Sequence, residues 1–181
     1  PVVDETIYQR IMDEVIHPTV EGMAAEGNHY SGFLYAGLMI MADGTPKVIE
    51  YNCRFGDPET QPILLRLQSD LVSHCLAAIE GKLNQQTANW DPRPAIGVVL
   101  AAGGYPGNYR GGNVIYGLSE VESSAKAKVF HAGTTLSDDN IVTSGGRVLC
   151  ATAMGDSVFD AQQRAYALAS KIHWDDIYLR Q

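Results

Sequence analysis

The residues that stand out for their chemistry lie in one short segment, from Val48 to Gln61, with the sequence VIEYNCRFGDPETQ. Because alternate residues of a strand share a face, Glu50, Asn52 and, if the strand continues, Arg54 should point the same way. A carboxylate, a carboxamide and a guanidinium on one face are costly to bury unless they have partners. This combination predicts a binding site for charged ligands.

Each of these three side chains has a preferred kind of partner. The oxygens of Glu50 and Asn52 suit a hard cation such as Mg²⁺ or Mn²⁺, which in turn binds nucleotide phosphates. The planar fork of Arg54 fits a carboxylate or a phosphate. Taken alone, so short a pattern is also explained by a surface ion pair between Glu50 and Arg54. The dense polar run that follows, FGDPE, is unlike a plain surface turn and favours a site.

A hairpin of two strands is predicted to hold this segment. Residues 33–41 are apolar throughout, which is typical of a buried strand. A turn at Asp43-Gly44 then leads into a second strand over residues 47–52. An irregular stretch rich in charge and turn formers, residues 53–62, follows the second strand.

Helices are predicted before and after the hairpin. The first covers residues 4–27, with Asp4 as its N-cap, and Pro18 should kink it or split it in two. Residues 64–80 are helical in pattern, in two pieces. A polar stretch with two prolines, residues 82–94, marks the expected domain boundary.

Beyond this boundary the sequence changes to short strands and glycine-rich loops. A strand within residues 95–104 runs into the loop YPGNYRGG. Further short strands are expected near residues 113–118, 127–135 and 147–154. A helix that Asp156 or Ser157 caps should then close the domain, ending at Ile172. Short strands with one closing helix predict a small α+β domain.

Composition argues against several classes of protein. The 181 residues carry a formal net charge of −8, so unaided binding to nucleic acid or to an anionic membrane is disfavoured. No apolar run approaches the ~20 residues that span a bilayer. The three cysteines are odd in number and lack CxxC spacing, which argues against a disulfide framework or a zinc site and predicts a cytoplasmic protein.

Several segments together resemble the phosphoribosylamine–glycine ligases, or glycinamide ribonucleotide synthetases, a family of ATP-grasp enzymes. The segment NCRFGDPETQ, preceded by GFLYAGLMI and KVIEY, resembles the end of the family's ATP-grasp domain. The segments that resemble its C-terminal domain are AAGGYPGNYRGG, KVFHAGT, GGRVLC and AQQRAY. The resemblance covers essentially the whole chain, in the family's order.

This resemblance implies a domain organisation. The fold would be α+β, with the C-terminal part of an ATP-grasp domain over residues 1–92 and a small α+β domain of short strands with one closing helix over residues 93–181. Family members are longer. The chain is therefore expected to be a fragment that lacks the N-terminal part of the same enzyme, including the ATP cradle, and to be inactive alone.

The resemblance also implies a reaction and roles for five residues. The reaction is the ATP-dependent ligation of glycine to 5-phosphoribosylamine through glycyl phosphate, giving glycinamide ribonucleotide, ADP and phosphate in de novo purine synthesis. Glu50 and Asn52 would hold Mg²⁺ or Mn²⁺ and thereby ATP, and Arg54 would stabilise the acyl phosphate. Asp57 and Glu59 would orient the substrate amines or Arg54. The strand that precedes Glu50 contains no acid, whereas many ATP-grasp enzymes place a further metal ligand there.

Two other interpretations stay open. The first is another ATP-grasp carboxylate ligase or carboxylase with the same E-x-N-x-R pattern, against which the segments GDPETQ and GGYPG argue. The second is a non-catalytic binding module, against which the joint presence of Glu50, Asn52 and Arg54 argues. Outside this group, Arg110 in the glycine-rich loop is a modest candidate for a phosphate contact.

Overall fold

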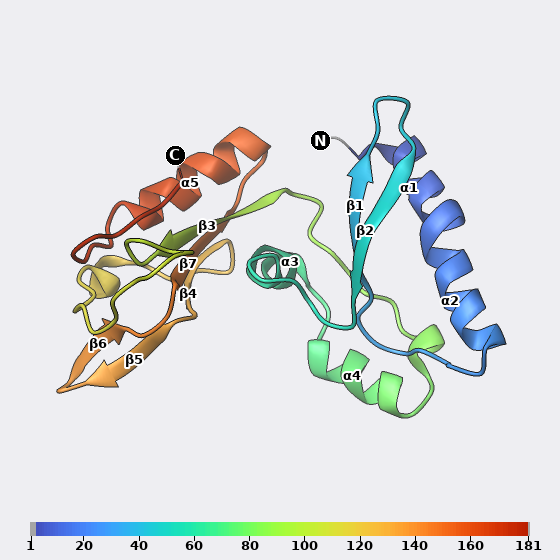
Figure 1. The fold of residues 1–181 in the computed structure, drawn as a ribbon, viewed down its shortest axis with the longest axis horizontal. Coiled ribbons are helices and arrows are strands. Elements are labelled where there is room, and N and C mark those ends of the chain that lie inside the picture. The colour runs from blue at the N-terminus through green and yellow to red at the C-terminus, as the bar shows by residue number, and fades with distance from the viewer. Residues whose placement is uncertain (1–2, 181) are drawn as a thin grey trace. The chain divides into compact units, whose positions relative to one another are not determined.

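The computed structural model describes residues 3–180, and its helices and strands fall into two units (Figure 1). Residues 1–56 and 70–87 form the first unit, and residues 57–69 and 88–181 form the second. Helices and strands are mixed along the chain, which confirms the predicted α+β class. A domain boundary at residue 92 stays a prediction. None of the helices in the described part of the chain has the length and apolar character needed to cross a membrane.

The first unit begins with a helical stretch in three segments. Helix α1 (Glu5–Ile11) is followed directly by a π-helical turn, η1 (Met12–Ile16), and by α2 (His17–Ala25). The Asp4 carboxylate accepts a hydrogen bond of 2.9 Å from the first turn of α1, which confirms the predicted N-cap. Pro18 has no N–H to donate, and it lies where the π-helical turn gives way to α2. The predicted kink or split is thus a change of hydrogen-bond pattern within one continuous stretch.

Strands β1 (Tyr35–Ile40) and β2 (Pro46–Asn52) form the predicted antiparallel hairpin. The register changes in its middle, because Gly37 pairs with Glu50 while the next residue of β1 pairs with a residue two positions earlier on β2. Ile49 is therefore an extra residue, a β-bulge in β2. The bulge resets the alternation of side chains immediately before Glu50.

The apolar residues of this hairpin are partly exposed, which corrects the prediction of a buried strand. Met39 of β1 is 55% exposed, and Ile49 of β2 is 65% exposed. Within the first unit, α1 and η1 contact β2. A two-stranded hairpin cannot bury both of its faces against one helical layer, so part of its apolar surface stays accessible.

Helix α4 (Leu71–Ile79) and the 3₁₀ turn η2 (Leu83–Gln85) complete the first unit. The Asp70 carboxylate caps α4 by accepting hydrogen bonds from the N–H groups of Val72 and Ser73, at 3.3 Å and 3.0 Å. This cap separates α4 from the shorter helix before it, which belongs to the second unit. The helical pattern after the hairpin is thus divided in two, as predicted, but the first of the two helices begins at Thr60, within the stretch predicted to be irregular.

A three-stranded antiparallel sheet in the order β3-β7-β4 forms the second unit's centre. Its strands are β3 (Ala95–Ala101), β7 (Arg147–Met154) and β4 (Ala127–His131). Helices α3 (Thr60–Arg66) and α5 (Val158–Ala169) both contact β3 and β7. The central strand β7 is buried along almost its whole length.

The two helices lie on opposite faces of this sheet. On one face, Val98 packs in the core with the buried alanines of α5. On the other face, a Cβ built on Gly97 would lie 3.4 Å from Pro62 of α3. Ser157 caps α5 by accepting a hydrogen bond of 3.0 Å from the helix's first turn, so the predicted closing helix is confirmed, although it ends at Ala169 and not at Ile172.

The remaining elements are short. Strands β5 (Thr134–Ser137) and β6 (Asn140–Thr143) form a separate hairpin, and the 3₁₀ turn η3 (Leu118–Glu120) lies between β3 and β4 in sequence. The strand predicted near residues 113–118 is instead a loop that makes isolated backbone bridges. The single strand predicted over residues 127–135 is divided between β4 and β5.

Candidate functional site

The predicted pair Glu50 and Asn52 lies on the regular part of β2, after the bulge, so the two side chains share a face. Gly37 stands directly opposite Glu50 on β1, and Tyr35 stands opposite Asn52. A Cβ built on Gly37 would lie 3.1 Å from the Cγ of Glu50, which is tighter than an ordinary contact. The glycine therefore leaves room for the Glu50 side chain across the strand pair.

Both side chains are available to a ligand. Within residues 3–180, no hydrogen bond or ion pair engages the Glu50 carboxylate or the Asn52 carboxamide, and the same residues contain no cluster of three or more His, Cys, Asp or Glu that could hold a metal ion. Two oxygen donors do not complete the coordination of a metal ion. They do fit Mg²⁺ or Mn²⁺ bound with a nucleotide, because Mg²⁺ keeps several waters and takes its other ligands from phosphates.

Arg54 lies beyond β2, because the strand ends at Asn52. The prediction that Arg54 shares a face with Glu50 required the strand to continue to residue 54, and it does not. Its Nη1 donates to the carbonyl of the next residue, Phe55, at 3.0 Å. The Phe55 ring packs against Phe33, with 4.2 Å between ring centroids, which fixes the backbone beside Arg54. The surface ion pair between Arg54 and Glu50 is absent among the described residues, so that explanation of the pattern is removed.

Asp57 belongs to the second unit, where its carboxylate has a definite partner. The Asp57 Oδ2 accepts a hydrogen bond of 3.1 Å from Nε of Arg147 and lies 2.9 Å from Nη2 of the same guanidinium. The third nitrogen, Nη1, donates to the Tyr105 hydroxyl at 2.8 Å. Arg147 and Tyr105 are therefore functional candidates that sequence reasoning missed.

The environment of Arg147 keeps it protonated. Partial burial lowers the pKa of the Arg147 guanidinium, whereas the hydrogen bond and charge of Asp57 raise it, and the net shift is upward. A signal for Arg147 was present, because it opens a strand directly after a Gly-Gly turn. Its partner, however, is 90 positions away in the sequence, and no local pattern joins the two.

Glu59 lies immediately before α3 in the second unit, and its side chain forms no capping hydrogen bond. Its position at the start of the helix favours a negative charge. Arg110 lies on the exposed glycine-rich loop and lines a small polar cavity of about 180 Å³, together with neighbouring residues of the chain and Asp176. Both residues stay candidates.

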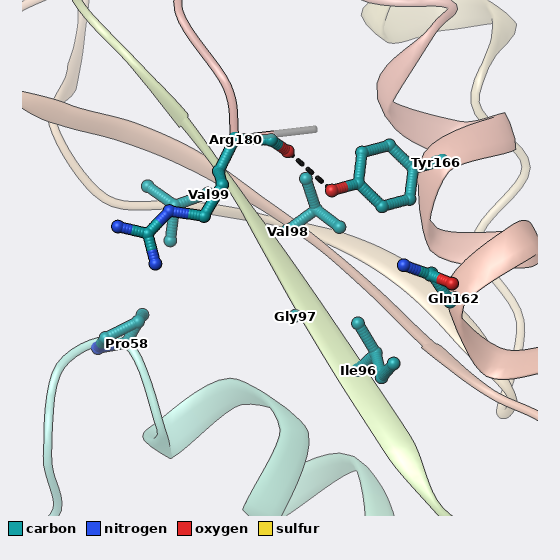
Figure 2. Close-up of a pocket in the computed structure, with 8 residues that line it drawn as sticks. All are labelled: Pro58, Ile96, Gly97, Val98, Val99, Gln162, Tyr166 and Arg180. Carbon is teal, nitrogen blue, oxygen red and sulfur yellow. Dashed lines mark hydrogen bonds between the residues drawn. The ribbon is translucent and has the colours of Figure 1, made fainter. Parts of the chain in front are cut away.

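The second unit also has a larger cavity, of about 480 Å³, beside β3 (Figure 2). Four consecutive residues of β3, 96–99, line it, together with Pro58, Gln162, Tyr166 and Arg180. Consecutive strand residues point to opposite faces, so the cavity follows the edge of β3 and not one face of the sheet. None of the predicted site residues lines this cavity.

Comparison with known proteins places the predicted site residues and Arg147 in matches to one family. A family model described as "Phosphoribosylglycinamide synthetase, ATP-grasp (A) domain" matches residues 1–60, and one described as "Phosphoribosylglycinamide synthetase, C domain" matches residues 95–181. This chain belongs to the phosphoribosylglycinamide synthetase family. All five predicted site residues lie within the ATP-grasp match, and Arg147 lies within the C-domain match.

Individual relatives agree with this assignment. Proteins named "Phosphoribosylamine--glycine ligase" from Escherichia coli strain K12 and from Vibrio cholerae are 64% and 66% identical to the chain, over 182 and 181 residues. The crystal structure of the ligase from Thermotoga maritima matches 99% of the chain with a TM-score of 0.82 and 35% identity, and the match covers 44% of that protein. The chain spans 42% of the length of the two curated relatives. The resemblance and the predicted fold are thereby confirmed.

Proposed function

We propose that this chain supplies part of the active site of a phosphoribosylamine–glycine ligase. The enzyme would join glycine to 5-phosphoribosylamine with conversion of ATP to ADP and phosphate, giving glycinamide ribonucleotide for purine synthesis. The observation that carries the proposal is the pair Glu50 and Asn52, which share a face, have no partner in the described chain, and fall within the ATP-grasp match.

Glu50 and Asn52 would hold Mg²⁺ or Mn²⁺ together with the ATP phosphates. When bound, the metal ion neutralises charge on the transferred phosphoryl group. A carboxylate is a poor electrophile, and the glycine carboxylate must first become an acyl phosphate. The amine of 5-phosphoribosylamine then attacks the acyl carbon, and phosphate leaves.

Arg54 would bind the negative oxygens of that acyl phosphate. Its guanidinium is exposed and makes one hydrogen bond to a neighbouring carbonyl, so it retains donors for a ligand. Donors aimed at developing negative charge are among the largest contributions to catalysis. Asp57 and Glu59 would orient the substrate amines, because a carboxylate favours an amine or ammonium group nearby.

The remaining contacts of ATP would come from the part of the relatives that this chain does not cover. We also propose a cytoplasmic location, which the three free cysteines, Cys53, Cys75 and Cys150, support.

A substrate panel tests the proposal, using a polypeptide of the relatives' full length that contains this chain. ADP release that requires both glycine and 5-phosphoribosylamine is the expected result. Turnover with bicarbonate in place of glycine would favour an ATP-grasp carboxylase. Absence of ADP release with every carboxylate and amine offered would favour a non-catalytic binding module.

A further inference from the structure

Three segments of the second unit that are distant in the sequence meet at Arg147. The guanidinium contacts Asp57, 90 positions earlier, and Tyr105, 42 positions earlier, and all three of its nitrogens are engaged. Its central carbon also lies 5.6 Å from the centre of the Tyr105 ring, which adds a cation–π contact. Arg147 therefore links the turn before α3 to the glycine-rich loop and to the start of β7.

The Tyr105 end of this link is itself held in place. A Cβ built on Gly146 would overlap the ring of Tyr105, so the ring packs directly on the backbone beside Arg147. Gly146 is buried, and its carbonyl accepts a hydrogen bond of 2.9 Å from the N–H of Ala102. The acceptor for Nη1 is therefore fixed by packing as well as by its hydrogen bond.

We propose that Arg147, held by Tyr105, is a positioning residue that sets the orientation of the Asp57 carboxylate for a substrate amine. Arg147 engages only Oδ2 of Asp57, and Oδ1 has no partner among the described residues. A carboxylate with one oxygen fixed presents the other in a defined direction. The inference rests on the proposed function, since it requires that Asp57 face a substrate.

An ordinary surface ion pair would not orient a carboxylate for a substrate. The side chains of Arg147 and Asp57 are 36% and 58% exposed, and an isolated pair at such exposure contributes little to stability. Arg164 and Asp160 form a comparable pair on α5, at 3.0 Å with 45% and 35% exposure, and neither belongs to the predicted site. Arg164→Ala is thus a matched control that removes an arginine and an ion pair without touching the link.

The test measures kcat and KM for glycine and for 5-phosphoribosylamine in the full-length polypeptide. Arg147→Ala should lower kcat/KM by about 10-fold to 100-fold, the range for misplacing a reacting group by about 1 Å. Arg147→Lys should recover part of the loss, whereas Arg164→Ala should leave kcat/KM unchanged. The double variant Asp57→Asn with Arg147→Ala should lose no more than Asp57→Asn alone, because both changes act on one carboxylate.

The outcomes separate the inference from the function it rests on. If Asp57→Asn loses activity while Arg147→Ala matches Arg164→Ala, the positioning role is wrong and the proposed function stands. If Asp57→Asn keeps full activity, the role of Asp57 and the inference both fail. Should Arg147→Ala not fold, Tyr105→Phe replaces it. Loss of that hydroxyl should lower kcat/KM by about 10-fold, the lower end of the usual effect of a hydrogen bond to a charged group, and an unchanged value would refute the inference.

Discussion

Replacing Leu100 by alanine should destabilise the second unit strongly. Leu100 lies in β3, is 0% exposed, and packs in the core formed by the sheet and α5. Substitutions of this kind cost about 2 to 5 kcal/mol, and the cost rises with the volume left empty. The core around Leu100 contains many alanines, whose short side chains cannot reach into the space. We therefore expect a loss of about 3 to 4 kcal/mol in the free energy of unfolding.

Urea denaturation followed by tryptophan fluorescence measures this loss in the correct unit. The chain has two tryptophans, Trp90 and Trp174, and both belong to the second unit. Trp174 is 4% exposed and lies in the same core as Leu100. With a slope of about 2 kcal/mol per molar urea, the midpoint should fall by about 1.5 to 2 M.

Leu136→Ala is the matched control, since Leu136 of β5 is 71% exposed. An exposed position away from caps and ion pairs changes stability by at most about 0.5 kcal/mol, or about 0.25 M in the midpoint. If Leu100→Ala moved the midpoint no further than this control, β3 would not be a core strand. The arrangement of sheet and helices described above would then be wrong.

Three further predictions concern a carboxylate, a helix cap and a thiol. Hydrogen bonds from Arg93 hold the pKa of the Asp91 carboxyl well below its usual range. The ionised Asp91 carboxylate should therefore stabilise the fold fully above about pH 4, and this stabilisation should be lost as the pH falls further. Urea titrations at several pH values should show that Asp91→Asn removes this pH dependence. An equal pH dependence in both proteins would contradict the prediction. Ser157→Ala should lower the free energy of unfolding by about 1 kcal/mol and Ser157→Asp should not, as midpoints in urea will show. Burial raises the pKa of the Cys150 thiol, so a thiol reagent should modify the other two cysteines in the folded chain and Cys150 only after unfolding; equal rates at all three would contradict this burial.

The elements around the candidate site could be predicted because their signals are local. The Asp4 cap, the turn at Asp43-Gly44 and the closing helix after Ser157 each depend on residues within a few positions of one another. Such short-range hydrogen bonds and turn preferences act almost independently of the rest of the fold. The shared face of Glu50 and Asn52 follows from strand geometry in the same way.

What the sequence could not predict depends on long-range packing. The bulge at Ile49 arises from the register of two strands, and no single residue marks it. The apolar run of β1 indicated a buried strand, but it did not indicate how much of the strand's apolar surface the first unit could cover. Arg147 and Asp57 are joined only through the fold, because a charged pair 90 positions apart leaves no periodic pattern.

Arg54 shows how a conditional prediction fails. Its place on the Glu50 face required that β2 continue to residue 54, but the strand ends at Asn52. The segment then turns, and the contact between Phe55 and Phe33 holds it there. The role proposed for Arg54 therefore rests on its exposed guanidinium and not on a shared strand face.

The most direct test of the central claim is ADP release that depends on glycine and 5-phosphoribosylamine, measured for Glu50→Gln and Arg54→Ala in the full-length polypeptide. Glu80→Gln is the control, because Glu80 is an exposed residue that pairs with Lys82 and lies outside the predicted site. Both site variants should fold but lose activity by about 100-fold or more, the scale for removing a group that stabilises transition-state charge, while the control keeps its activity. Full activity in both site variants would mean that Glu50 and Arg54 have no part in binding metal or phosphate, and the proposed site would be wrong.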